Sequence, residues 1–147
     1  LGTNDKRCFM DRRQYDEVIE GKIYVGSADE AKYAITDQKA THVYDVRVNG
    51  REEQVRYAYT HSPIEENNEA ETIKKGAKEI AAAIHNGDSV YIHCGSGTGR
   101  AAVMTAATLI ELGEVSTLDE AMNIVLQKRK GARFQPIMVD ALEKLYK

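Results

Sequence analysis

Residues 89–112 read SVYIHCGSGTGRAAVMTAATLIEL, and this stretch decides the fold. Residues 89–93 are hydrophobic enough to form a central strand of a sheet. A helix is expected over residues 100–112, because this segment is apolar and is followed by Gly113. The stretch therefore predicts a buried strand, a glycine-rich loop and a helix in direct succession.

The loop places five residues between Cys94 and Arg100, and three of the five are glycine. Three glycines at fixed positions arise by chance about once in 3000 at a glycine usage of about 7%. Small residues between a strand and a helix N-terminus can turn successive backbone N–H groups inward and bind an anion. We therefore expect a phosphate-binding loop formed by Gly95, Ser96, Gly97, Thr98, Gly99 and Arg100.

Cys94 and Arg100 supply the chemistry of this loop. The amide dipoles and the nearby guanidinium favour a thiolate over a thiol at Cys94, which makes it a nucleophile at neutral pH. Arg100 adds planar paired donors that match two phosphoryl oxygens and follow their charge into the transition state. The sequence thus combines a nucleophile, an anion cradle and a cationic clamp in one loop.

The segments before the loop alternate between strand and helix patterns. Strands are expected at residues 22–26 and 41–46, and at 55–59, where Val55, Tyr57 and Tyr59 alternate. Ser27 and Glu30 have the spacing of a capping box, which predicts a helix continuing toward residue 38. A longer helix is expected around residues 73–84, where apolar residues recur on one face.

Two more helices are expected after the loop. Thr117 and Glu120 have capping-box spacing, and Pro136 suits the first turn of a last helix. Strands mixed with helices predict an α/β domain with a central mixed sheet flanked by helices. With 147 residues the chain has room for one domain, which we assign to residues 11–147, with residues 1–10 as a flexible tail.

The composition restricts the partners and the compartment. The chain has 20 Lys+Arg against 23 Asp+Glu, a net charge of -3, so no global positive field collects nucleic acid or lipid, and an anionic ligand must be bound locally. We see neither a signal peptide nor a membrane span and expect a cytoplasmic protein, with a monomer favoured.

The 2 cysteines make no disulfide framework, and Cys8 lies in the tail. The scattered His42, His61 and His85 lack ligand spacing, so no metal site is expected.

The segment HCGSGTGR resembles the His-Cys-x5-Arg signature of the protein tyrosine phosphatases, specifically the dual-specificity branch. From about residue 15, the segments KIYVGS, THVYDVR, SPIEEN, SVYIHC and LDEAMNIVLQKR occur in the order and approximate spacing of that family. The resemblance implies a protein tyrosine phosphatase-like fold and a two-step phosphatase without a metal or cofactor. Cys94 would form a cysteinyl phosphate, a carboxylic acid would protonate the leaving oxygen, and its carboxylate would then activate water.

The same resemblance places the general acid on a loop roughly 30 residues before the nucleophile. Here this acid loop, residues 62–67, reads SPIEEN. Glu66 lies 28 residues before Cys94 and matches the family's position, with Glu65 as the second choice. Either glutamate departs from the family's usual aspartate, and it can act as the acid provided that burial keeps it protonated. Asp45 is a further alternative, although its position resembles a structural aspartate–arginine corner of the family.

Two residues beside the loop carry further expectations. The resemblance implies that His93 braces the loop through a hydrogen bond to backbone. Ala101 replaces the Ser or Thr that most members use to hydrogen-bond the sulfur, so breakdown of the phosphoenzyme should be slower. Ser96 and Thr98 are candidate substitutes for that hydroxyl.

A basic cluster follows near the end of a predicted helix and consists of Lys128, Arg129, Lys130 and Arg133. Helix C-termini stabilise positive charge, so we interpret these side chains as solvated helix-end charges. A patch for a second phosphate or an acidic substrate is the alternative interpretation.

The resulting hypothesis is a phosphatase for phosphomonoesters, acting on protein phosphotyrosine with phosphoserine and phosphothreonine. Its substrate is expected to be a phosphorylated protein or a small phosphomonoester, with no nucleic acid or membrane partner. One alternative is a non-catalytic phosphate-binding pseudophosphatase, and another is a phosphatase for a non-protein substrate such as phosphoglucan. A rhodanese-like sulfur or arsenate enzyme is a third, because such enzymes also place a cysteine in an anion loop.

Overall fold

The computed structural model describes residues 15–50 and 55–147, and within them five strands form one sheet. The strands are β1 (Tyr15–Ile19), β2 (Ile23–Gly26), β3 (His42–Asp45), β4 (Ala58–His61) and β5 (Val90–His93). Their order is β1-β2-β5-β3-β4, with β1 antiparallel to β2 and the other neighbours parallel. The predicted central mixed sheet is therefore confirmed, while the expected tail and Cys8 lie outside the described residues.

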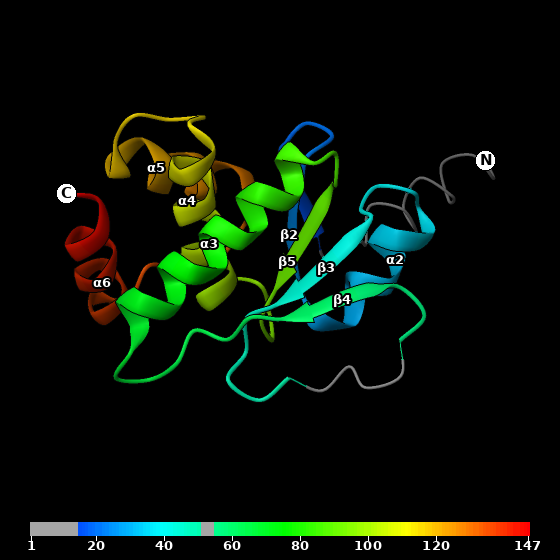
Figure 1. Cartoon of the computed structure of the whole chain (residues 1–147), viewed down its shortest axis with the longest axis horizontal. Coiled ribbons are helices and arrows are strands. Elements are labelled where there is room, and N and C mark those ends of the chain that lie inside the picture. Colours follow the sequence, from blue (N-terminus) through cyan, green and yellow to red (C-terminus); the bar gives the residue numbers. More distant parts are fainter. Residues whose placement is uncertain (1–14, 51–54) are drawn as a thin grey trace.

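Helices cover the two faces of the sheet unequally, as Figure 1 shows. The short helix α2 (Ala31–Thr36), preceded by the 3-10 turn η1 (Ala28–Glu30), lies on one face. The other face carries α3 (Glu69–His85), α4 (Arg100–Leu112), α5 (Leu118–Lys128) and α6 (Pro136–Tyr146). In the described residues, no helix is both long and apolar enough to cross a membrane.

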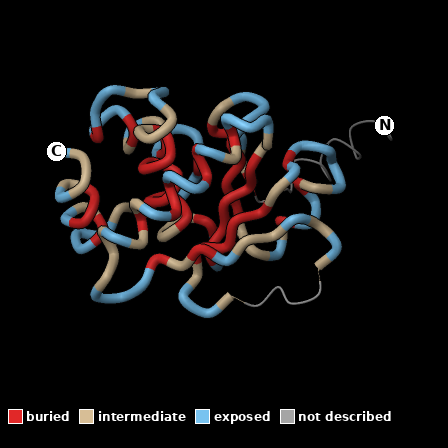
Figure 2. Tube along the Cα trace, viewed as in Figure 1, coloured by how far each residue is buried: buried red, intermediate tan, exposed pale blue. Residues whose placement is uncertain are grey.

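The strands alternate their side chains between two cores, as the period of two requires. Val25, Tyr44 and Ile92 belong to the larger core, which also contains residues of α3 to α6. Tyr24 and Tyr91, their neighbours along β2 and β5, belong to the smaller core beneath α2. Figure 2 shows that the strands at the centre of the sheet are buried along their whole length.

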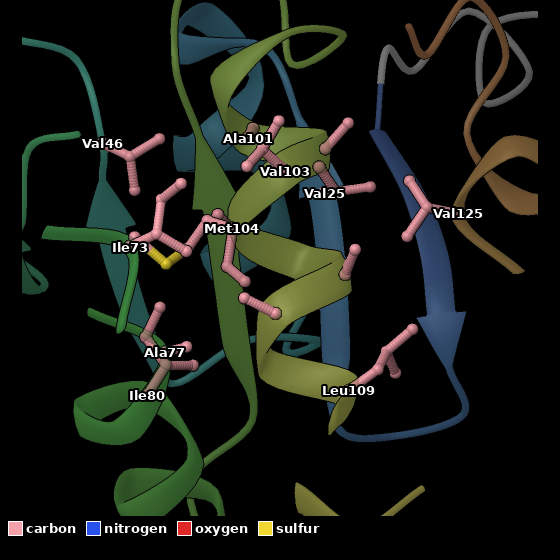
Figure 3. Close-up of a cluster of buried hydrophobic side chains, with 14 of the residues drawn as sticks. Val25, Val46, Ile73, Ala77, Ile80, Ala101, Val103, Met104, Leu109 and Val125 are labelled. Atoms are coloured by element: carbon pink, nitrogen blue, oxygen red, sulfur yellow. The ribbon is translucent and has the colours of Figure 1, made fainter. Parts of the chain in front are cut away.

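Helix α4 lies in the middle of the larger core and fixes the end of the loop that precedes it. All of its residues from Ala101 to Leu109 are buried, and most of them are small. Figure 3 shows its side chains between α3, which contributes Ile73 and Ile80, and the strand that carries Val25. A helix packed on several sides has little freedom to shift, so Arg100 at its first turn is held at the carboxyl end of β5.

Three local features differ from the expectations. β1 has no counterpart in the prediction, and β4 begins at Ala58 instead of Val55. The predicted capping box at Ser27 was wrong, because its side chain makes no cap bond, and its buried hydroxyl has no hydrogen-bond partner among the residues that the structure describes. The capping box of Thr117 and Glu120 is confirmed, with both reciprocal bonds present.

Candidate active site

The phosphate loop, residues 94–99, directs its backbone carbonyls toward the protein body. The carbonyls of Gly95 and Thr98 accept from the backbone N–H groups of Ala28 and Arg133, each at 2.9 Å. The carbonyl of Gly99 accepts from an amide within α4 at 3.1 Å. The three remaining carbonyls are bound by the side chains of His93 and Arg129.

The amide groups of the same loop are left for a ligand. Within the described part of the chain, the N–H groups of residues 95–99 have no hydrogen-bond acceptor. Gly99 is the N-cap of helix α4 and provides no side-chain cap, so the first turn of the helix also retains open donors. Because carbonyls point away and donors stay open at a helix N-terminus, this loop fits an anion such as phosphate.

Gly97 is the residue that this loop conformation requires. Its φ is 81°, in the left-handed region that side chains disfavour, and an added Cβ would overlap the carbonyl group of Gly26. The loop therefore packs directly against the end of β2.

Arg129 holds the loop from behind. Its Nη2 donates to the carbonyl of Ser96 at 2.7 Å and its Nε to that of Gly97 at 3.2 Å. Its Nη1 lies 3.0 Å from Oδ2 of Asp16 on β1. The residue is only 6% exposed, so the interpretation of Arg129 as a solvated helix-end charge was wrong. No local pattern reveals this function, because its partners are 32, 33 and 113 residues away.

Cys94 lies at the base of the loop and is 8% exposed. Its Sγ accepts a hydrogen bond from the backbone N–H of Ala101 at 3.4 Å. Ala101 lacks the side-chain hydroxyl that most family members have at this position, but its backbone N–H supplies a donor to the same sulfur. The two candidate substitutes, Ser96 and Thr98, hydrogen-bond each other at 2.7 Å at an exposed position.

Arg100 connects the phosphate loop to the acid loop. It is half-buried, and its Nε donates to the carbonyl of Ile64 at 3.1 Å. Its terminal nitrogens have no partner among the described side chains and backbone, so they are available to a phosphoryl group. Arg100 also lines the pocket that contains Cys94, which has a volume of about 540 Å³. The structure thus brings the predicted nucleophile, cradle and clamp to one pocket.

His93 braces the loop from the end of β5. It is fully buried, and its Nδ1 donates to the carbonyl of Cys94 at 2.9 Å. Because a carbonyl only accepts, this bond places a proton on Nδ1. The same nitrogen lies 3.8 Å from Oδ1 of Asp45, its neighbour on β3.

Asp45 is buried and fully occupied by structural partners. Its carboxylate accepts from Nε and Nη2 of Arg47 at 2.9 and 2.8 Å and from the hydroxyl of Tyr59 at 2.6 Å. Burial by itself would raise the pKa of Asp45, but the hydrogen bonds from Arg47 and Tyr59 outweigh it and lower the pKa below its ordinary value. A carboxylate held ionised in this way is a poor proton donor, which favours the structural interpretation.

The two glutamates of the acid loop lie beside the pocket, not within its lining. Glu66 is exposed and lines an adjoining hollow together with Arg100. Glu65 is also exposed, and its backbone N–H donates to the hydroxyl of Thr72 at 3.1 Å. Of the three candidate acids, Glu66 lines the hollow next to Arg100, so it stays our first candidate. Neither glutamate has the burial that was expected to keep it protonated.

A family model covers most of the chain. Residues 23–143 match the model described as the catalytic domain of dual specificity phosphatases. The chain belongs to this family. This membership leaves the rhodanese-like alternative without support.

Individual relatives are more distant. A segment of 44 residues is 46% identical to "Protein tyrosine phosphatase PRL-1" of Leishmania major, covering 30% of this chain and 25% of that protein. The crystal structure of human DUSP28 superposes with a TM-score of 0.76 at 19% identity, over 89% of this chain and 91% of that one. DUSP15 gives a TM-score of 0.76 at 18% identity, over 90% and 87%. PTPMT1 gives 0.72 at 18% identity, over 88% and 92%. These likenesses support the fold of the family.

Proposed function

We propose that the chain hydrolyses phosphomonoesters on proteins, phosphotyrosine together with phosphoserine and phosphothreonine, through a cysteinyl-phosphate intermediate. The observation that carries the proposal is the orientation of the phosphate loop. Its carbonyls are bound to the protein body, its amides are open, and Sγ of Cys94 lies at its base. Such a loop stabilises the charge that develops on the phosphoryl oxygens during transfer.

In the first step, the Cys94 thiolate attacks phosphorus, and the bond to the leaving oxygen breaks. The amides of residues 95–99 and Arg100 hold the phosphoryl oxygens, and Glu66 gives its proton to the leaving oxygen. The products are a free hydroxyl group on the substrate and a cysteinyl phosphate.

In the second step, water releases the phosphate. The Glu66 carboxylate accepts a proton from water as its oxygen attacks phosphorus, the S–P bond breaks, and the thiolate returns. The N–H of Ala101, 3.4 Å from Sγ, supports the sulfur as its negative charge develops. The net reaction consumes one water and requires no metal or cofactor.

Hydrolysis of an aryl phosphate by the wild type and Cys94→Ser tests the mechanism. We expect turnover by the wild type and a loss of about 10³-fold or more in the variant, because a neutral hydroxyl replaces the thiolate. Acid quench and mass spectrometry should find a phosphate on Cys94 in the wild type. Absence of wild-type turnover would favour the non-catalytic alternative, and turnover retained by Cys94→Ser would exclude the proposed nucleophile.

A substrate panel tests the protein specificity. It should contain phosphotyrosine, phosphoserine and phosphothreonine peptides, phosphoglucan and phosphoinositide vesicles. The lipid arm is included because PTPMT1, a structural neighbour, has been crystallised with PI(5)P. The cradle residues 95–99 include no lysine, which disfavours polyphosphorylated headgroups. We expect the highest kcat/KM on phosphotyrosine peptides, and higher values on glucan or lipid would overturn that assignment.

A further inference from the structure

Three adjoining hollows surround Arg100, and they differ in charge. The first, of about 540 Å³, contains Cys94 and the phosphate loop. The second, of about 90 Å³, is shared by Arg100 and Arg133. The third, of about 440 Å³, lies on the side of Glu66. A substrate bound at Cys94 therefore has two further recesses beside it, both bordered by Arg100.

The first hollow is cationic although the whole chain is acidic. Among its described lining residues are Arg47, Arg100 and Arg133, and no carboxylate is among them. The chain as a whole carries a net charge of -3. A local concentration of cations in an acidic protein marks a surface that favours anions.

Two of the three arginines already have functions. Arg100 is the clamp for the reacting phosphate, and Arg47 directs Nε and Nη2 to the carboxylate of Asp45. The side chain of Arg133 is exposed, and the described residues offer it neither a hydrogen bond nor an ion pair. Its backbone N–H, in contrast, donates to the carbonyl of Thr98 at 2.9 Å, which fixes it beside the phosphate loop. Arg133 is thus an anchored cation without a partner, at the rim of the catalytic pocket.

The third hollow has the opposite character. It includes the carboxylates of Glu66 and Glu69 together with the apolar side chains of Ile137 and Met138, and Ile137 is 54% exposed. A compact phosphomonoester bound at Cys94 would contact the first hollow and neither of the other two. An extended polypeptide carries several side chains of different polarity, so it matches a cationic recess that adjoins a partly apolar one.

We propose that Arg133 is a specificity-determining residue that binds an acidic side chain next to the phosphorylated residue of a polypeptide substrate. This inference rests on the proposed function for its choice of a phosphopeptide. The guanidinium of Arg133 donates paired hydrogen bonds to the carboxylate while Arg100 holds the phosphate. Substrates with an acidic neighbour are therefore selected over those with a neutral or basic neighbour.

Binding to a Cys94→Ser background tests the inference without requiring turnover. Three phosphotyrosine peptides that differ in their flanking residues, with Glu, Ala or Lys on both sides, are titrated by fluorescence anisotropy. We expect the Glu peptide to bind about 3- to 10-fold more tightly than the Ala peptide. Arg133→Ala should remove this preference, and Arg133→Glu should reverse it toward the Lys peptide.

Lys130→Ala is the matched control, because Lys130 is also an exposed cation of the basic cluster but lines none of the three hollows. It should retain the preference for the Glu peptide. Preference that survives in Arg133→Ala, or an equal loss for all three peptides, would overturn the assignment. So would a lack of binding to every peptide combined with Arg133-dependent binding to phosphoinositide vesicles.

Failure of the proposed function gives a different result. In that case the wild type hydrolyses no aryl phosphate or phosphopeptide, while the binding titrations still report whether Arg133 selects an acidic neighbour. The two hypotheses are thereby tested by separate measurements.

Discussion

The phosphate loop and the acid loop meet at Arg100, but the protein holds them in different ways. Every carbonyl of the phosphate loop is bound by the scaffold, and Arg129 is buried behind it to bind two of them. The acid loop is anchored through Ile64, which is fully buried and whose carbonyl accepts from Arg100. Beyond Ile64, the side chains of Glu65 and Glu66 are exposed.

This difference separates two tasks. A site for phosphate must exist before the substrate arrives, because donors that are already oriented need no reorganisation during the reaction. A general acid must be protonated when the leaving group departs, and burial favours the neutral form. Glu66 is exposed. Under the proposed function, a polypeptide substrate that covers the adjoining hollow would bury it.

The largest expected effect on stability comes from replacing Gly97 in the phosphate loop. Gly97→Ala should lower the free energy of unfolding by about 2 to 4 kcal/mol, because the new Cβ overlaps Gly26 and φ is 81°. Urea denaturation measures the loss. Gly95→Ala is the matched stability control, since a Cβ there meets nothing within 4 Å. Its free energy of unfolding should lie within about 1 kcal/mol of the wild-type value. Equal destabilisation by both variants would contradict the requirement for glycine at position 97.

Replacing the proposed proton donor should have the next largest effect, on activity alone. Glu66→Gln should reduce kcat/KM for a phosphotyrosine peptide by about 10²-fold, because an amide cannot protonate the leaving oxygen. For p-nitrophenyl phosphate the loss should be smaller, since that leaving group needs less assistance. Glu65→Gln is the matched control and should stay near wild-type activity. The reverse pattern would transfer the acid to Glu65.

Arg129 offers a way to loosen the phosphate loop without altering its sequence. Arg129→Met should destabilise the fold by about 1 to 3 kcal/mol, because two loop carbonyls and Asp16 lose their charged partner. KM for an aryl phosphate should rise at the same time. Lys128→Met removes a neighbouring exposed cation and should change neither quantity. An Arg129→Met variant with unchanged KM would show that Arg129 does not set the geometry of the phosphate loop.

The smallest effect is expected at Asp45 and depends on pH. Asp45→Asn should lower the free energy of unfolding by about 1 to 2 kcal/mol at pH 7, because it weakens the bonds from Arg47 and Tyr59. The folded pKa of Asp45 lies below its ordinary value of 3.8, so its ionised form stabilises the protein above about pH 4. That contribution disappears as pH falls through the lowered pKa.

Urea denaturation of the wild type and Asp45→Asn from pH 7 to pH 3 measures this dependence. The gap between the two curves should narrow as pH falls below about 4. A gap between the two proteins that widens as pH falls would contradict the assigned direction of the pKa shift.

Local patterns predicted the elements whose causes are local. The bonds between Thr117 and Glu120 connect residues three apart, so the capping box could be recognised from sequence. Ser27 and Glu30 have the same spacing, yet Ala28 N–H bonds the phosphate loop and Tyr91 bonds the carbonyl of Ser27. These tertiary contacts favour a 3-10 turn over a capped helix.

In the site, too, the residues of a local motif were predicted and those that depend on distant contacts were not. Cys94 and Arg100 lie within one short motif, and the structure places both in one pocket. Arg129 was misinterpreted because its run of cations is typical of a solvated helix end, whereas its partners come from distant segments. β1 was missed because its buried residues, Tyr15 and Val18, are three positions apart instead of two, and because it carries adjacent acidic residues, Asp16 and Glu17.

The contact between Asp16 and Arg129 has a practical consequence for dividing this chain. The family match begins at residue 23, beyond β1, whereas the carboxylate that pairs with Arg129 lies on β1. A recombinant fragment that begins at residue 23 would keep every residue of the catalytic motif. It would lose Asp16, the ion-pair partner of Arg129, and β1, the edge strand of the sheet. A fragment that starts before Asp16 should therefore be more stable than one that starts at residue 23.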